Sequence, residues 1–102
     1  MLWRQGDIYI ETVSSIPEGA IEKQDAVLAD GELTGHQHRI KDPRSAIVFE
    51  SRGQLFVDVL ADCAEVVHEE HGTIPLSRGC YRVWRQREYD PMRAVRQRIV
   101  LD

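Results

Sequence analysis

All four histidines of this chain fall in two short clusters, His36-Gln37-His38 and His68-Glu69-Glu70-His71. Histidines with unrelated structural roles would be scattered along the sequence, so the grouping predicts one shared site. Neutral imidazole is the commonest protein ligand for metal ions, and it is also the side chain that titrates near neutral pH. The two clusters therefore predict a metal centre or an acid-base centre.

The first cluster lies in residues 33–40, which we expect to form a strand. Residues two apart on a strand point to the same side, so His36 and His38 share a face. Two imidazoles on one face can converge on a single ion. The spacing therefore predicts that both side chains are metal ligands.

The second cluster ends another expected strand, residues 64–70. Strand parity puts His68 and Glu70 on the same side as the apolar residues 64 and 66, which indicates that both point inward. His71 would lie on the opposite face of a regular strand. Gly72, however, permits a bulge or turn that brings the His71 imidazole back toward the site.

These residues predict a centre built from His36, His38 and His68 and completed by His71 or Glu70. Such a ligand set suits Zn, Fe, Mn, Ni or Cu. In a small metalloenzyme the metal would activate water or dioxygen, and Glu70 would be the catalytic residue that assists proton transfer. Two alternatives stay open: a metal-free pocket in which His68 and Glu70 transfer protons, and histidines that only pack.

The last quarter of the chain is rich in arginine, and residues 80–89 are expected to form a strand. On that strand Tyr81 and Val83 share a face with Arg85 and Arg87. Guanidinium groups placed this way can fork onto a carboxylate or phosphate, which predicts a small anionic ligand for the centre. The other interpretation is a solvated strand end that pairs with acidic neighbours.

The composition bounds the class of protein. The chain has 102 residues, of which 42% are hydrophobic and 29% charged, as in ordinary globular proteins. We therefore expect a single β domain over residues 1–102 that folds alone or as a small homo-oligomer. The net charge of −4 disfavours nucleic acid as a partner, because domains that grip phosphates are usually basic.

Two further features bear on location and redox state. The sequence has no apolar run long enough for a signal peptide or a membrane span, which predicts a soluble cytoplasmic protein with no membrane partner. Cys63 and Cys80 do not form a CxxC pair, and two thiols do not make a secreted disulfide framework. We expect both cysteines to be reduced and to lie in or near the core.

Turn signals recur at short intervals, which favours an all-β fold: a small barrel or sandwich of antiparallel strands. The clearest hairpin joins residues 46–50 to 55–60 across Ser51-Arg52-Gly53-Gln54. A short C-terminal helix from Asp90-Pro91 is a further option, since proline is well suited to the first helical position. The remaining expected strands are residues 6–13, 26–29, 33–40, 64–70 and 80–89, with 72–79 as a connection.

The motifs resemble those of a family of small uncharacterised bacterial and phage proteins. That family carries a Gly-His-x-His element, a His-Glu-Glu-His element and a Gln-Arg-Glu-Tyr ending. The corresponding residues here are 35–38, 68–71 and 86–89, so the likeness spans most of the chain. The resemblance supports the site without naming a reaction.

The chain resembles the cupins more weakly. These are small β-barrels whose metal is held by a His-x-His pair, a nearby glutamate and a later histidine. His36 and His38 match the pair, and Asp42 stands four residues after His38, where cupins usually have glutamate. The cupin Pro-x-Gly-x-x-His element is missing, because Pro75 is four residues from Gly79 and no histidine follows. The resemblance therefore implies inward histidines in a small barrel, but not cupin topology.

The leading prediction is a soluble metal-binding β-protein with a histidine-rich centre. The alternative from another functional class is a non-catalytic binding or assembly module, such as a phage-associated accessory protein, whose histidines stabilise the fold or an interface. Size exclusion with light scattering, together with pull-downs, discriminates between them, since a monomer that enriches no partner in pull-downs argues against the module.

Overall fold

The computed structural model describes residues 1–31 and 35–86. These residues form strands β1 (Leu2–Gln5), β2 (Ile8–Val13), β3 (Ile21–Glu22), β4 (Val27–Asp30), β5 (Gln37–Ile40), β6 (Ala46–Ser51), β7 (Gln54–His68) and β8 (His71–Arg85). Every strand pair is antiparallel, which confirms the all-β fold. Within the described ranges, no helix is long and apolar enough to cross a membrane.

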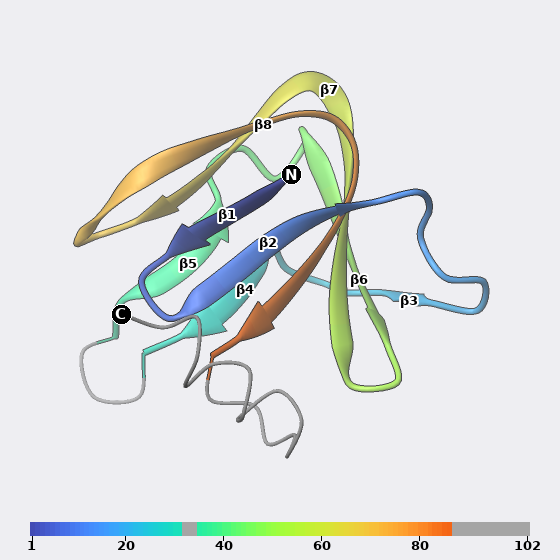
Figure 1. Ribbon diagram of the computed structural model, residues 1–102, viewed down its shortest axis with the longest axis horizontal. Helices are drawn as coiled ribbons and strands as arrows, with labels where there is room; N and C mark the ends of the chain where they lie inside the picture. Colours follow the sequence, from blue (N-terminus) through green and yellow to red (C-terminus); the bar gives the residue numbers. More distant parts are fainter. Residues whose placement is uncertain (32–34, 87–102) are drawn as a thin grey trace.

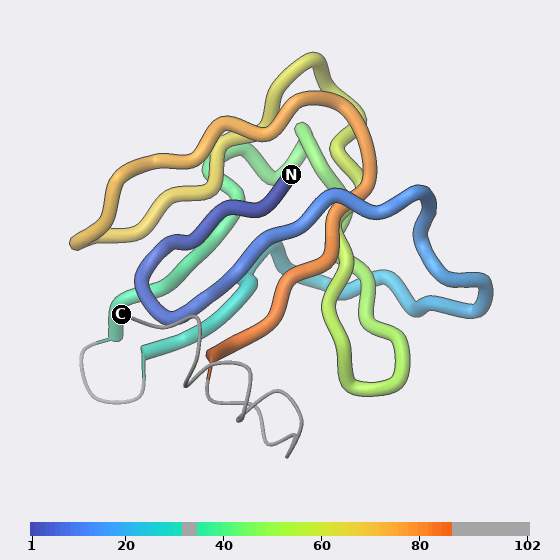
Figure 2. Tube along the Cα trace, in the orientation of Figure 1, coloured from blue at the N-terminus to red at the C-terminus, as the bar shows by residue number. Residues whose placement is uncertain are grey.

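The strands form one sheet in the order β1-β2-β8-β7-β5-β4, with β6 beside β7 and β3 beside β6 (Figure 1). β7 and β8 are 15 residues long and arch across the molecule (Figure 2). Their register shifts between Val59 and Cys63, and such an irregularity bends and twists a strand. The first half of β7 therefore pairs with β6 and the second half with β5, so the sheet curls into a half-barrel.

The inner side of the curled sheet holds the hydrophobic core. In β2, Ile8 and Ile10 are fully buried, whereas Tyr9 between them is only partly buried. The same alternation buries Val57 and Val59 in β7. Because side chains alternate across a strand, this pattern leaves one face of the sheet for the core and the other for solvent.

The expected hairpin is confirmed between β6 and β7, where Ser51 pairs with Gln54. The connection is two residues, Arg52-Gly53, instead of the four that the sequence suggested. Both residues have positive φ, 52° and 77°. Two left-handed central residues are typical of the type I′ turn, whose twist matches that of the flanking strands.

The Arg52→Asn substitution should raise the free energy of unfolding by about 0.5 kcal/mol. A side chain with an ordinary Cβ is disfavoured at positive φ, and asparagine tolerates this region better than arginine does. Urea unfolding would measure the change. Arg52→Ala removes the same charge without relieving the backbone, so an equal gain in that variant would contradict the explanation.

Several boundaries differ from the sequence expectation. The strand expected over 6–13 begins at Ile8, because Gly6-Asp7 is the turn that follows β1. The strands expected over 55–60 and 64–70 are parts of the single strand β7, which ends at His68, so residues 69 and 70 lie in the following turn. Residues 72–79, expected to be a connection, lie within β8. Proline has no backbone N–H to donate to a neighbouring strand. Pro75 is tolerated in β8 because β2 pairs with β8 only from Cys80 onward, so no hydrogen bond to β2 is needed at Pro75.

Three further expectations have separate outcomes. Cys63 is exposed, so its expected place near the core is wrong, whereas Cys80 is partly buried. The short strand β3 lies in a polar stretch where no strand was expected. The C-terminal helix expected after Asp90 lies outside the described residues.

Candidate metal centre

Three turns or strand ends bring both histidine clusters to one end of the half-barrel. They are the β1–β2 turn, the start of β5 and the β7–β8 turn, which lie together at the left of Figure 1. The imidazole of His68 is central: its ring centroid lies 4.2 Å from that of His38, 4.6 Å from that of His71 and 5.6 Å from that of His36. The structure thus places all four predicted ligands in one cluster.

The β7–β8 turn explains how His71 reaches the cluster. His68 and His71 are paired directly across the two-residue turn Glu69-Glu70. A strand that continued to residue 70 would need a bulge or turn at Gly72 to bring His71 back. A chain reversal at Glu69 achieves this instead, and it leaves Glu69 and Glu70 exposed on the turn.

One group in the described chain has the spacing of a metal site. His36, His68 and Glu69 each offer a ligand atom, and these atoms lie within 4.8 Å of one another. The hydrogen bond from the Gln37 backbone N–H to Glu69 Oε1, 2.9 Å long, lowers the pKa of the Glu69 carboxyl below its ordinary value. Two imidazoles and a carboxylate form a recurrent set for zinc and for non-haem iron.

Glu70, the predicted catalytic residue, contacts His36 instead of joining that group. Glu70 Oε1 lies 3.0 Å from His36 Nδ1, and its side chain is 66% exposed. A carboxylate only accepts hydrogen bonds, so the proton sits on Nδ1 and Nε2 of a neutral His36 carries a lone pair. In metal sites this carboxylate-histidine contact orients the ligating ring.

His38 is held differently, by Gln5 at the end of β1. The Gln5 amide nitrogen donates to the carbonyl oxygens of Val66 and Gly72, at 3.0 and 2.8 Å, so the orientation of the amide is fixed. Its Oε1 therefore accepts from His38 Nδ1 at 2.9 Å. The other ring nitrogen, Nε2, lies 3.2 Å from Asp7 Oδ1. Gln5 and His38 are 2% and 4% exposed, so the link is sealed from water.

The Asp7 carboxylate lies between the guanidinium of Arg85 and the imidazole of His38. Burial raises the pKa of the Asp7 carboxyl, but the Arg85 guanidinium and further contacts outweigh it, and the pKa lies below its ordinary value. Burial, with the neighbouring His68, lowers the pKa of His38. Arg85 Nε lies 4.0 Å from Asp7 Oδ2, and Arg85 also donates to the Asp30 carbonyl. Arg87, the other predicted anion ligand, lies outside the described residues.

Three residues of the cluster were not singled out from the sequence: Gln5, Asp7 and Glu69. Gly6-Asp7 between two β-rich runs is a hairpin signal, which would have placed Gln5 and Asp7 beside a turn. Nothing local in the sequence, however, indicates that this turn meets histidines about thirty or more residues away.

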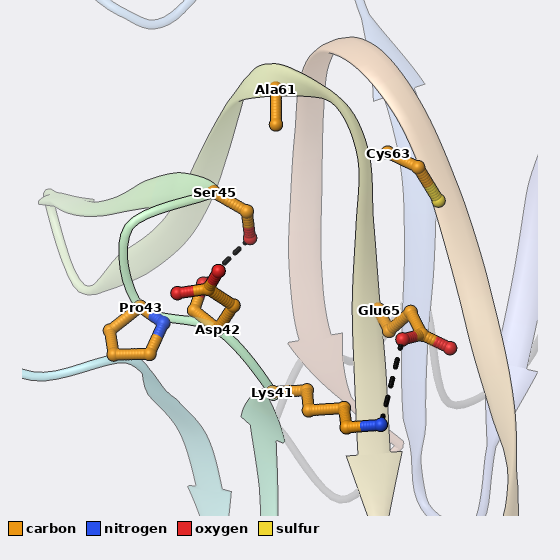
Figure 3. A pocket seen from close by; sticks show the side chains of 7 residues that line it. All are labelled: Lys41, Asp42, Pro43, Ser45, Ala61, Cys63 and Glu65. Atoms are coloured by element: carbon orange, nitrogen blue, oxygen red, sulfur yellow. Dashed lines mark hydrogen bonds and ion pairs between the residues drawn. The ribbon is translucent and has the colours of Figure 1, made fainter.

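Asp42, the counterpart of the cupin glutamate, lies in a different surrounding. It accepts from the Arg44 backbone N–H at 3.0 Å and helps to line a hollow of about 450 Å³ (Figure 3). Ser45 Oγ donates to the Asp42 carbonyl there, and Lys41 pairs with Glu65 at 3.9 Å. None of the seven lining residues is a histidine, so the hollow is separate from the cluster.

Comparison with known proteins identifies the family but no activity. No curated protein and no solved structure matches the chain. One family model, described as a domain of unknown function (DUF8820), matches residues 4–86. That range spans Gln5 through Arg85 and so includes every site residue that the structure describes. The match covers most of the sequence, and the chain therefore belongs to the DUF8820 family.

Proposed function

We propose that this protein binds a divalent transition metal ion through His36, His68 and Glu69. The observation that carries the proposal is the convergence of three potential ligand atoms within 4.8 Å. Three protein ligands leave room for water or substrate on the ion, which is the arrangement of catalytic rather than structural zinc sites. A metal at this position would supply activated water or dioxygen, as in a small metalloenzyme.

The surroundings of His36 support the proposal, whereas those of His68 require a change of tautomer. Glu70 holds His36 with Nδ1 protonated, which directs Nε2 to act as the ligand. At His68 the Glu70 backbone N–H donates to Nδ1 at 3.0 Å. A neutral His68 that accepts this bond carries its proton on Nε2, so coordination through Nε2 would require that proton to move to Nδ1 and the hydrogen bond from the Glu70 N–H to be given up. Zn, Fe, Mn, Ni and Cu all accept such a ligand set.

The His-x-His pair has a different role here from the one that the cupin resemblance implies. In cupins both histidines of the pair hold one ion. Here His36 belongs to the group with His68 and Glu69, whereas His38 is bound by Gln5 and faces Asp7. The proposal therefore assigns only the first histidine of the pair to this ion.

Titration of the wild type with cobalt(II) should give a visible absorption band. In Glu69→Gln this band should be much weaker, and the affinity for cobalt(II) should fall at least about 10-fold, because a charged ligand is lost. Cys63→Ser is the control, because it removes an exposed thiol and leaves the three proposed ligands unchanged. We expect its titration to match that of the wild type. Equal affinity in Glu69→Gln and the wild type would overturn the proposed ligand set.

A further inference from the structure

The imidazole of His68 lies against two other rings of the cluster. Its centroid is 4.2 Å from that of His38 and 4.6 Å from that of His71, with interplanar angles of 36° and 46°. His68 is the proposed ligand whose own hydrogen bond, from the Glu70 N–H to Nδ1, has to be given up when Nε2 coordinates. The orientation of a coordinating His68 ring therefore depends on the rings beside it.

His38 is the fixed member of this group of rings. The Gln5 amide nitrogen donates to two backbone carbonyls, and the amide oxygen accepts from His38 Nδ1 at 2.9 Å. The second ring nitrogen, Nε2, lies 3.2 Å from Asp7 Oδ1. His38 is 4% exposed, whereas His68 is only partly buried. A buried ring that is engaged at both nitrogens cannot turn without losing those contacts, so it makes a rigid support for its neighbour.

Gly6 gives this packing the room that it needs. A Cβ built on Gly6 would lie 2.7 Å from His71 Nε2 and 3.3 Å from His38 Cε1. A contact under 3.0 Å forces a side chain to move, and the exposed His71 would move before the buried His38. The glycine in the β1–β2 turn therefore lets both rings close on His68.

We propose that His38 is a positioning residue for the metal site: its fixed ring sets the orientation of the His68 ligand, and Gly6 leaves space for that packing. This inference rests on the proposed function, because it concerns the same ion. It gives the two histidines of the His-x-His pair separate roles, since His36 is a proposed ligand and His38 acts through His68. Residues that orient a ligand typically contribute about 10- to 100-fold to metal affinity.

Cobalt(II) titration of Gly6→Ala and Gly53→Ala tests the role of the packing. Both glycines lie in two-residue turns at positive φ, 59° and 77°, so an added Cβ strains both backbones. Of the two, Gly6 alone would also press its Cβ against imidazoles, because nothing lies within 4 Å of a Cβ on Gly53. We expect Gly6→Ala to bind cobalt(II) about 10-fold more weakly than the wild type and to change the visible band, which depends on ligand geometry. Gly53→Ala should match the wild type.

His38→Asn is the second variant, because its amide nitrogen can still donate to Gln5 while the ring beside His68 is gone. It should weaken cobalt(II) binding about 10-fold and still take up one ion per chain at saturation. If one of the two variants, Gly6→Ala or His38→Asn, does not fold by circular dichroism, the other decides.

The outcomes separate this inference from the proposed function. Wild-type affinity with an unchanged band in His38→Asn would overturn the positioning role and leave the proposed function standing, as would equal losses in Gly6→Ala and Gly53→Ala. Complete loss of the ion in His38→Asn would make His38 a ligand and also overturn the positioning role. A wild type that binds no cobalt(II) overturns both proposals.

Discussion

A chain carrying both His36→Ala and His68→Ala should lose metal affinity at the Glu69 position by at least about 100-fold. Loss of a partner that merely orients a ligand costs 10- to 100-fold in affinity. This variant removes two of the three proposed ligands themselves, and Glu69 alone is an exposed carboxylate on a turn. Competition with a chromophoric chelator would measure the affinity.

The control for this variant must come from another residue type, because all four histidines lie in the cluster. Lys41→Ala with Glu65→Ala is suitable, since it removes a solvent-exposed ion pair 3.9 Å long. We expect the control to bind metal as the wild type does. A His36→Ala/His68→Ala chain that matched the control would show that the ion, if any, is held elsewhere.

The Gln5→Leu substitution should lower the free energy of unfolding by about 3 kcal/mol. Gln5 is 2% exposed and joins β1 to β5, β7 and β8 through His38, Val66 and Gly72. Leucine has a similar volume but leaves these polar groups without the amide, and each buried group that loses its partner costs about 1–3 kcal/mol. Urea unfolding in the presence of a chelator measures this cost without any contribution from metal binding.

Gln54→Leu makes the same chemical change at an exposed strand position. Surface substitutions of this kind usually stay within about 0.5 kcal/mol. A Gln5→Leu chain as stable as Gln54→Leu would show that the amide does not hold the strands together. It would also remove the argument that Gln5 fixes the ring of His38.

Local chemistry explains which elements could be predicted from the sequence. The β6–β7 hairpin depends on Arg52-Gly53 and two flanking β-rich runs, all within a few residues. The length of β7 could not be predicted in this way. Residues 61–63 lie between two expected strands, yet β7 passes through them with a register shift. Only the pairing with β8 decides between a turn and a bulge.

In the candidate metal site, too, some features can be predicted from the sequence and others depend on the fold. The grouping of the histidines is visible in the sequence, because it depends on residue type alone. The sequence does not show which acidic residue lies beside the histidines. Strand parity favours Glu70 only if β7 continues to residue 70, and β7 ends at His68. The turn at Glu69-Glu70 reverses the chain and brings Glu69 within 4.8 Å of the potential ligand atoms of His36 and His68. Asp7 lies beside His38 because the curl of the sheet brings the β1–β2 turn next to β5, and no short-range sequence pattern encodes that contact.

The most direct test is the metal content of the protein purified without an affinity tag, measured by plasma mass spectrometry. The His36→Ala/His38→Ala variant is the comparison, because it removes a proposed ligand together with the buried histidine beside it. We predict near-stoichiometric metal in the wild type and almost none in the variant. A wild type that stays metal-free after reconstitution with Zn, Fe, Mn, Ni and Cu would contradict it and favour a non-catalytic binding module whose histidines are structural.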